Sequence, residues 1–427
     1  MTILEDLKWR GLYADCTAPD VLEERLEKKP IVLYAGFDPT ADSLHVGNLV
    51  PLIGLRRFQN YGHRPIVLAG GATGSIGDPS GRASERQLLT PEELKHNVDK
   101  VRKQLTSILD FSEDISNTAK IVDNASWTAP ISFLDFLRDV GKHITVNSMV
   151  AKESVRARME DRDVGISFTE FSYMLLQGHD FYHLNKEENC ELQIGGTDQW
   201  GNITVGTELT RKKSGNTVYG LTFPLITNSD GSKFGKSVGG AVWLDAAKTS
   251  VYRFYQYWIN IDDRDVIKYL KYFTFLDRIA IDELENKRQE NPGAREAHHA
   301  LALEMTSLVH GQAATEDAIK ASRILFGGGL EGITESAFKD VAAEIPNASI
   351  QRSEINGEGV PVIEALVASG LSSSKGQARK DIHGGGVNVN NIRIQDPQAK
   401  LTANDVHFDK YILLRRGKKN YAALILE

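Results

Sequence analysis

The stretch Tyr34-Ala-Gly-Phe-Asp-Pro-Thr-Ala-Asp-Ser-Leu-His-Val-Gly-Asn48 decides the fold of the N-terminal half of the chain. Residues 31–33 before it form an apolar run typical of a buried strand, and apolar residues after it recur at helical spacing. A strand, a turn with glycine and aspartate, and a helix are the local layout of a nucleotide-binding α/β unit. Thr40 and His45 are polar donors where a polyphosphate would lie, and Gly47 would let the helix backbone approach a ligand. Taken alone, this stretch leaves an ATP site and an unrelated strand–turn–helix equally open.

Length and composition indicate an ordinary globular enzyme of more than one domain. The chain has 427 residues, 41% hydrophobic and 25% charged, which excludes a disordered, collagen-like or coiled-coil protein. Cys16 and Cys190 lie in no metal-ligand or disulfide spacing, so we expect no metal site and a reducing compartment. The N-terminus lacks the apolar core of a signal peptide, and no apolar run is long enough to span a bilayer. We therefore expect a cytoplasmic enzyme with no membrane partner.

Charge is distributed unevenly along the chain. The net charge is −7, yet residues 371–427 carry ten Lys and Arg against five Asp and Glu, so the remainder carries −12. An acidic body with a basic C-terminal end suggests that any polyanion contacts that end.

A second strand leads into a glycine-rich loop. Residues 66–69 read as a buried strand, and the alternation with helices implies a parallel sheet whose ligands lie at the carboxyl ends of its strands. The glycines of residues 70–77 would then line a crevice in which Asp78 holds a substrate ammonium; the alternative is a flexible turn. Arg82 and Arg86 follow closely, and either steady a pyrophosphate or are ordinary surface charge.

Residues 167–180 read as a helix with three polar residues on one face. Tyr173, Gln177 and Asp180 are spaced i, i+4 and i+7, and apolar residues flank them. They are either a buried face whose polar groups satisfy one another, or the floor of a pocket. Such a pocket would suit a substrate with a polar head and a polar tip.

Two later motifs complete a set of four. The strand of residues 191–195 leads to Gly196, and Asp198 either caps the helix that follows or accepts ribose hydroxyls. Lys233-Phe-Gly-Lys-Ser237 lies on a polar loop and resembles the second signature of class I aminoacyl-tRNA synthetases, Lys-Met-Ser-Lys-Ser. The opening stretch resembles the first signature, His-x-Gly-His. With the glycine loop and residues 193–202, these motifs make the chain resemble the bacterial tyrosyl-tRNA synthetases along essentially its whole length.

The resemblance implies a tyrosine–tRNA ligase that takes ATP with Mg²⁺ as a substrate and has no prosthetic group. It implies that the phenol of tyrosine is bound by Tyr34 and Asp180, the ammonium by Asp78, Tyr173 and Gln177, and the carboxylate by Gln199. The residues that would face ATP or the adenylate are Gly36, Asp38, Gly47, Asn48, Gly196, Asp198 and Lys236. The catalytic donors to phosphate would be Thr40, His45, Arg82, Arg86, Lys233 and Lys236. Asn48 stands where the family's first signature often has a second His, which leaves its role open.

The predicted fold class is α/β: a Rossmann-like parallel-sheet catalytic domain, then an α-helical domain and a small α+β RNA-binding domain. The expected domains are residues 1–247 with a dimerisation insertion around 130–160, 248–326 for anticodon recognition, a linker at 327–353, and 354–427 for RNA. The implied partners are tRNA(Tyr), L-tyrosine, ATP and a second copy of the chain in a homodimer. RNA phosphates would be contacted by Lys375, Arg379, Lys380, Arg415, Arg416, Lys418 and Lys419, unless these form only a solvated basic face.

Two other functions stay open. A tryptophan–tRNA ligase shares the fold, but Tyr34 and Asp180 at the phenol end and the RNA-binding tail disfavour it. An RNA-binding protein that has kept the fold and lost aminoacylation is favoured only by Asn48.

Overall fold

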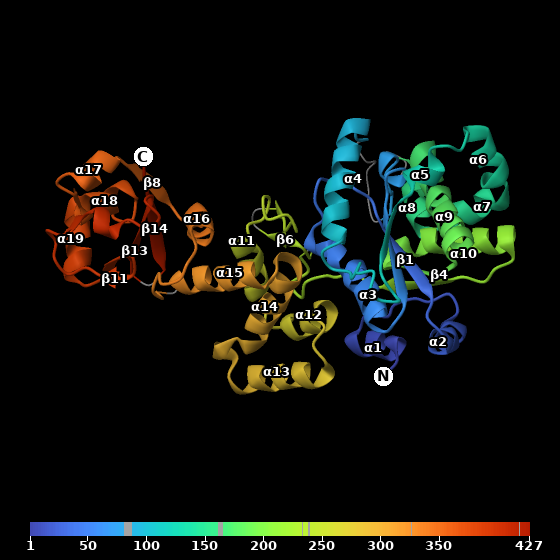
Figure 1. Cartoon of the computed structure of the whole chain (residues 1–427), viewed down its shortest axis with the longest axis horizontal. Helices are drawn as coiled ribbons and strands as arrows, with labels where there is room; N and C mark the ends of the chain where they lie inside the picture. The colour runs from blue at the N-terminus through green and yellow to red at the C-terminus, as the bar shows by residue number, and fades with distance from the viewer. Residues whose placement is uncertain (81–87, 161–164, 233, 238–239, 326, 418) are drawn as a thin grey trace. The chain divides into compact units, whose positions relative to one another are not determined.

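A five-stranded parallel sheet forms the centre of the N-terminal part of the protein (Figure 1). The computed structural model describes residues 1–80, 88–160, 165–232, 234–237, 240–325, 327–417 and 419–427. The strand order is β3 (Lys120–Asp123), β2 (Arg64–Ala69), β1 (Val32–Phe37), β4 (Cys190–Gly196) and β5 (Tyr219–Phe223). Every neighbouring pair is parallel. The predicted parallel sheet is therefore confirmed, and the carboxyl ends of its strands lie at one edge, where such sheets bind ligands.

Helices α3 and α4 lie on one side of β1, and helices α9 and α10 lie on the other (Figure 1). The helices from the N-terminus to the insertion are α1 (Ile3–Arg10), α2 (Pro19–Lys28), α3 (Leu49–Asn60), α4 (Pro91–Leu105), α5 (Ala125–Thr128), α6 (Phe133–Asp139), α7 (Val146–Val150) and α8 (Glu153–Glu160). They are followed by α9 (Phe168–Glu188), α10 (Trp200–Ser214), the hairpin β6 (Lys236–Ser237) and β7 (Gly240–Ala241), α12 (Val266–Phe273), α13 (Arg278–Glu290) and α14 (Glu296–His310).

Two glycines allow α9 and α10 to approach each other closely. A Cβ atom added at Gly178 would lie 3.1 Å from a methyl group of Val205, and one added at Gly206 would lie 3.0 Å from the ring of Phe181. This close packing fixes α9, whose inward face carries polar residues, against α10. At its other end α9 stops at Asn189, whose left-handed backbone (φ 55°) turns the chain into β4.

Local periodicity would predict one helix over residues 149–159, where the chain forms two. Residues 149–159 have helical spacing, but the chain forms α7 and α8 with a turn between them. The turn places Lys152 so that its ammonium donates to the Thr204 hydroxyl of α10 at 2.8 Å. This tertiary contact with α10 is invisible to local periodicity.

A second five-stranded sheet lies near the C-terminus, in the order β11 (Ile392–Arg393), β10 (Val387–Val389), β13 (Tyr411–Arg416), β14 (Asn420–Leu426) and β8 (Asn347–Ile350). It packs on a core that includes residues of α18 (Val362–Ala368) and α19 (Lys375–His383). The remaining elements are α11 (Val251–Ile259), α15 (Gln312–Ile324), α16 (Glu335–Glu344), α17 (Arg352–Asn356), and the paired short strands β9 (Val360–Pro361) and β12 (Lys400–Leu401). The α-helical segment and the small α+β fold are both as predicted.

The chain divides into two compact units. One contains Met1–Lys248 and Ile261–Leu301, and the other contains Thr249–Asn260 and Ala302–Glu427. The stretch predicted as a linker contains α16 and β8, and β8 joins the C-terminal sheet by pairing with β14. The functional domain boundaries at residues 247, 326 and 353 stay a prediction. None of the described helices is long and apolar enough to cross a membrane.

Candidate active site

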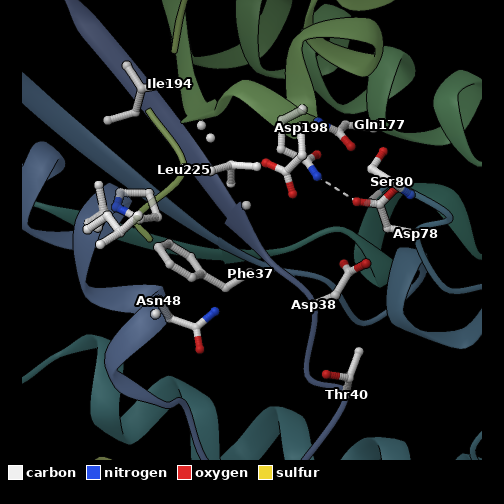
Figure 2. Close-up of a pocket in the computed structure, with 18 of the residues that line it drawn as sticks. Phe37, Asp38, Thr40, Asn48, Asp78, Ser80, Gln177, Ile194, Asp198 and Leu225 are labelled. Atoms are coloured by element: carbon white, nitrogen blue, oxygen red, sulfur yellow. Dashed lines mark hydrogen bonds between the residues drawn. The ribbon is translucent and has the colours of Figure 1, made fainter. Parts of the chain in front are cut away.

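A cavity of about 830 Å³ opens at the carboxyl ends of β1, β2 and β4 (Figure 2). Every residue predicted to bind tyrosine lines it. The predicted ATP-side residues that line it are Gly36, Asp38, Thr40, His45, Gly47, Asn48, Gly196 and Asp198. Lys236 is exposed on β6 and does not line the cavity, while Arg82, Arg86 and Lys233 lie outside the described residues. The first signature, the glycine loop, α9 and residues 193–199 therefore meet at one site, and Phe234 is the described residue of the second signature that lines it.

The deep end of the cavity holds the Tyr34 hydroxyl, which has no hydrogen-bond partner in the described part of the chain. The Tyr34 side chain is 1% exposed, and no described residue hydrogen-bonds its hydroxyl. Burial raises the pKa of Tyr34 well above its usual value, and the negative charge of Asp180 adds to the effect. A buried, unsatisfied hydroxyl costs about 1–3 kcal/mol, so this position favours a ligand that hydrogen-bonds to it.

Asp180 is fully buried but held by two neutral donors. Asn124 Nδ2 donates to Asp180 Oδ2 at 2.9 Å, and Trp127 Nε1 donates to Asp180 Oδ1 at 2.8 Å. Burial raises the pKa of Asp180 to about 7, although both hydrogen bonds act against this rise. The ring of Trp127 stacks on His183, with the centroids 4.4 Å apart. The carboxylate is thus fixed in place and close to its protonation midpoint at neutral pH.

A chain of hydrogen bonds connects this end of the cavity to Asp38. Asn124 Nδ2 also donates to Thr73 Oγ1 at 3.0 Å, and the Thr73 hydroxyl donates to Asp38 Oδ1 at 2.7 Å. The Tyr173 hydroxyl donates to Asp38 Oδ2 at 2.6 Å. Asp38 was predicted to face the adenylate; it lines the cavity and also fixes the Tyr173 hydroxyl.

Asp78 is held at the middle of the cavity. It accepts from the backbone N–H of Ser80 at 2.9 Å and from Gln199 Nε2 at 2.6 Å. Asn202 Nδ2 lies 3.4 Å from Asp78 Oδ1, 3.1 Å from Gln177 Oε1 and 3.4 Å from Gln199 Oε1. The two N–H bonds of this buried amide are therefore shared among three predicted tyrosine-binding residues, of which Gln177 is the nearest.

The cavity has an anionic middle. Figure 2 shows the carboxylates of Asp38, Asp78 and Asp198 around the same space. Burial, followed by the charge of Asp78, raises the pKa of Asp198. Three carboxylates around one space favour a cation between them, as a substrate ammonium would be.

The ATP side is built on the start of α3. His45 Nδ1 accepts from the Gly47 N–H at 3.0 Å, and Asn48 Oδ1 accepts from the His45 N–H at 3.0 Å. Because Nδ1 accepts, the imidazole proton lies on Nε2, which can donate to a ligand. The side-chain oxygen of Asn48 is used in this cap, so its NH₂ group is the one that can donate into the cavity. The start of α3 also presents the positive end of a helix dipole.

The two signature segments are joined by backbone hydrogen bonds. The Val46 N–H donates to the Val242 carbonyl, and the Val242 N–H donates to the Gly235 carbonyl, both at 3.0 Å. Gly235 has φ +80°, and an added Cβ would lie 2.9 Å from a methyl group of Val46. Only glycine fits this backbone conformation and contact without strain.

Several residues of the site were missed by the sequence interpretation. Thr73, Ser80 and Gln193 line the cavity, and Asn124, Trp127 and Asn202 hold its carboxylates. Asn124 and Trp127 follow β3, so the rule that ligands lie beyond the carboxyl ends of parallel strands could have found them. Gln193 and Asn202 belong to a motif that was noticed, but nothing in their spacing marks them as site residues.

The residues predicted to bind RNA lie in the second unit and differ in their surroundings. Lys375, Arg379, Lys380 and Lys419 are exposed, and the Lys375 ammonium donates to Glu364 at 2.6 Å. Arg415 and Arg416 are only partly exposed: Arg415 stacks over Tyr421, and Arg416 donates to the Leu371 carbonyl and lies 3.5 Å from Asp381. Lys418 lies outside the described residues.

Comparison with known proteins identifies relatives over the whole chain. The family model described as tRNA synthetases class I (W and Y) matches residues 26–327, and that of the tyrosine–tRNA ligase SYY-like C-terminal domain matches residues 337–424. The tyrosine–tRNA ligase of Opitutus terrae is 59% identical over 424 residues, 99% of each chain, and that of Roseiflexus castenholzii is 50% identical over 420 residues, 98% of each. The crystal structure of a C-terminally truncated Aspergillus nidulans mitochondrial tyrosyl-tRNA synthetase is 32% identical, with a TM-score of 0.68. It covers 76% of this chain and 94% of that one.

Proposed function

The chain belongs to the tyrosine–tRNA ligases of class I, and from this we propose which of its residues bind tyrosine and ATP. The observation that carries the assignment is the buried Tyr34 hydroxyl, which no described side chain or backbone group pairs with and which lies at the same end of the cavity as Asp180. The phenol hydroxyl of tyrosine can donate to Asp180 and accept from Tyr34, which satisfies both groups. Phenylalanine would leave the Tyr34 hydroxyl unpaired, at a cost of about 1–3 kcal/mol, and would add no donor to the two that Asp180 already has.

The middle of the cavity would bind the amino-acid end of tyrosine. Its ammonium lies among Asp78, Tyr173 and Gln177, and Gln199 orients its carboxylate. These side chains are pre-organised by Asn202 and Asp38, so little ordering is required when the substrate binds.

The ATP side would stabilise charge on the phosphates. An oxygen of the tyrosine carboxylate attacks the α-phosphorus, the bond to the β-phosphate oxygen breaks, and pyrophosphate leaves. Thr40 and His45 line the cavity, and with the N-terminal end of α3 they would donate to these oxygens, so catalysis would be mainly positioning and electrostatic stabilisation. Asp198 and Asn48 would hold the ribose. The terminal adenosine hydroxyl of tRNA then attacks the carbonyl carbon and AMP leaves.

Mg²⁺ would arrive with ATP as part of that substrate. In the described part of the chain, no group of three or more His, Cys, Asp or Glu residues could hold a metal ion. Mg²⁺ commonly binds through substrate phosphates and water with few protein ligands, so the cavity fits this role without a dedicated protein site.

The test is amino-acid-dependent ATP–pyrophosphate exchange with tyrosine, phenylalanine and tryptophan. We expect exchange with tyrosine only. Exchange with tryptophan would show that the pocket around Asp180 is misassigned, and no exchange from folded protein would favour an RNA-binding protein without activity.

We also propose that the protein is a homodimer that associates through α6, α7 and α8. Large apolar side chains are exposed on these helices, among them Phe133 (64%) and Leu134 (75%) of α6 and Val146 (61%) of α7. Exposed apolar groups of this density mark association sites. In sedimentation, Leu134→Asp should convert the dimer to a monomer, while Ile279→Asp, 70% exposed on α13, should not. A monomeric wild-type protein, or a dimeric Leu134→Asp variant, would contradict the proposal.

The exposed cations of α19 would bind tRNA phosphates. Arg379→Glu with Lys380→Glu should weaken tRNA binding and reduce its salt dependence, while tyrosine-dependent exchange stays unchanged. An unchanged affinity for tRNA would remove these residues from the interface. Because tRNA charging serves translation, we propose the cytoplasm as the compartment of this enzyme.

A further inference from the structure

The wall of the cavity on the ATP side includes a turn that precedes the second signature. Thr227, Gly231, Ser232 and Phe234 all line the cavity. The turn is closed by Asn228, whose N–H donates to the Ser232 carbonyl at 3.2 Å and whose Nδ2 donates to the Ser232 hydroxyl at 2.8 Å. None of the sequence motifs assigns a role to residues 227–232.

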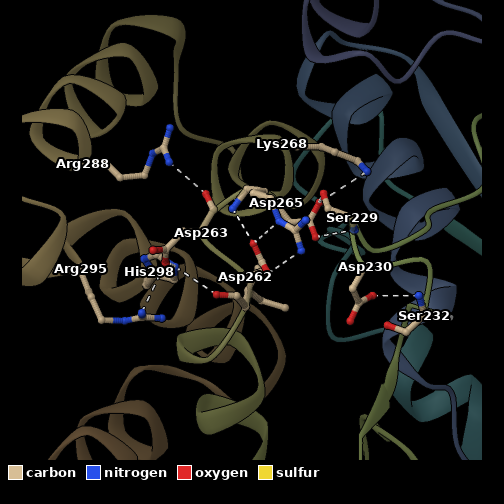
Figure 3. Close-up of polar contacts among 12 residues, drawn as sticks. Ser229, Asp230, Ser232, Asp262, Asp263, Asp265, Lys268, Arg288, Arg295 and His298 are labelled. Carbon is tan, nitrogen blue, oxygen red and sulfur yellow. Dashed lines mark hydrogen bonds and ion pairs between the residues drawn. The ribbon is translucent and has the colours of Figure 1, made fainter.

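One face of α12 holds this turn through polar contacts (Figure 3). Asp265, 1% exposed, accepts from the Ser229 N–H at 2.8 Å and from the Ser229 hydroxyl. Lys268 Nζ donates to the Thr227 carbonyl at 3.1 Å, and the Tyr269 hydroxyl donates to Asn228 Oδ1 at 2.6 Å. Asp265 immediately precedes α12 and is spaced i, i+3 and i+4 with Lys268 and Tyr269, so the three lie on one face of the helix.

The same face continues as an aromatic contact with the second signature. The ring of Phe234 lies edge-on to Tyr269 and stacked on Phe273, with 5.2 Å between centroids in each case. Phe234 is 7% exposed and immediately precedes Gly235, which packs against Val46 of the first signature. A shift of α12 would therefore be transmitted to the junction of the two signatures.

Helix α12 is itself anchored at both ends. At its C-terminal end, Arg57 of α3 donates to the Thr274 carbonyl at 2.6 Å, and Arg10 of α1 donates to the Leu276 carbonyl at 2.8 Å. Just before its N-terminal end, Asp263 lies 3.0 Å from His298 Nε2 and 3.4 Å from Arg295 (Figure 3). A support fixed in this way can hold a loop in one position.

We propose that Tyr269, with Asp265 and Lys268, is a positioning residue for the ATP half of tyrosine activation. The α12 face fixes the turn of residues 227–232 and, with it, the cavity wall beside the phosphates. It makes no contribution to tyrosine recognition, because the residues assigned to tyrosine lie on β1, α9, the loop after β2 and the start of α10. This proposal rests on the proposed function and assigns one further part of the same site.

The test compares two hydroxyl deletions on one helix in the full-length protein. Tyr269→Phe removes the hydrogen bond to Asn228 and keeps the ring against Phe234. Tyr272→Phe is the matched control: the half-buried Tyr272 hydroxyl lies near Gly11 and makes no hydrogen bond to the described turn, and phenylalanine keeps the ring beside Lys268. Ser229→Ala provides an independent variant, since it removes one donor to Asp265 from the other side of the contact.

We expect Tyr269→Phe to lower kcat/KM for ATP in pyrophosphate exchange about 5- to 10-fold, the effect of one buried hydrogen bond. Ser229→Ala should also lower kcat/KM for ATP. For Tyr272→Phe, kcat/KM for ATP should stay within twofold of the wild-type value. The dissociation constant for tyrosine, measured without ATP, should be unchanged in all three.

Two results would overturn the proposal. One is the same kcat/KM for ATP in the Tyr269→Phe and Tyr272→Phe variants. The other is a loss of tyrosine affinity as large as the loss in the ATP step, which would indicate general loosening of the cavity. A wild-type protein without exchange would instead overturn the proposed function, so the two failures are distinguishable.

Discussion

Replacing Trp127 by Phe should weaken tyrosine binding in a way that depends on pH. The change removes the indole N–H that donates to Asp180 Oδ1 at 2.8 Å, and it keeps a ring to stack on His183. A hydrogen bond to a charged group is worth about 1.5–3 kcal/mol, and 1.36 kcal/mol corresponds to one pH unit of pKa. Loss of this donor should therefore raise the pKa of Asp180 from about 7 by roughly one to two pH units.

The direction in which tyrosine affinity changes with pH follows from the hydrogen bond between the phenol hydroxyl of the ligand and Asp180. A phenol hydroxyl that donates to Asp180 favours the carboxylate form, so tyrosine binding releases a proton and strengthens as pH rises through 7. At pH 7 about half of the wild-type protein has an ionised Asp180. In the variant, the ionised fraction would fall to about 1–10%, so the apparent dissociation constant for tyrosine should rise about 5- to 50-fold.

The assay is tyrosine binding from pH 6 to pH 9 for wild type, Trp127→Phe and the control Trp9→Phe, a tryptophan of α1 outside the cavity lining. Taking the ratio of variant to wild type at each pH cancels the titration of tyrosine itself. The ratio should be large at pH 6 to 7 and fall markedly by pH 9. A ratio that stays constant over this range would refute the reasoning, because Trp127 would then act through packing and not through the ionisation of Asp180.

Two further predictions concern the middle of the cavity and the junction of the signatures. Asn202→Ala should raise the KM for tyrosine about 10-fold at saturating ATP, because Asp78, Gln177 and Gln199 lose their common donor; an unchanged KM would contradict its orienting role. Gly235→Ala should slow adenylate formation at least about 10-fold with tyrosine affinity intact, because it adds a side chain at φ +80° and a contact with Val46. Gly240→Ala, with φ +103° but no described atom within 4 Å of the added methyl group, is the control and should be affected less in single-turnover measurements.

The sequence was sufficient for the fold of the catalytic part because its signals are local. Thr90 caps α4 with Glu93, as the Thr-Pro-Glu-Glu pattern predicts, and the buried strand runs before Tyr34 and Gly70 identify β1 and β2. The rule that parallel strands present ligands at their carboxyl ends then brought Tyr34, Asp78 and Asp198 to one edge. Side-chain spacing on α9 supplied Tyr173, Gln177 and Asp180.

What the sequence could not supply depends on contacts between distant segments. The donors to Asp180 come from residues 124 and 127, more than 50 positions away along the chain. Strand β8 was assigned to a linker because its partner, β14, lies more than 70 residues later. The contacts between α12 and residues 227–232 also join segments that are distant in the sequence. From the sequence alone, Asp265 is one of several acidic residues near a helix start, and nothing local indicates its hydrogen bond to Ser229. Each of these depends on tertiary pairing that periodicity does not contain.

The chemistry at the deep end of the cavity also separates tyrosine from tryptophan. An indole N–H is only a donor, whereas a phenol hydroxyl both donates and accepts. Tryptophan could therefore satisfy Asp180 but would leave the Tyr34 hydroxyl, already without a partner among the described residues, as an unused buried donor. Phenylalanine would satisfy neither group. Leaving a buried polar group unpaired costs more free energy than a normal hydrogen bond contributes. Tyr34 and Asp180 therefore select tyrosine mainly by penalising the binding of other amino acids. The same burial that raises the pKa of Tyr34 is thus the source of the discrimination, since a solvated hydroxyl would lose little by having no partner in the ligand.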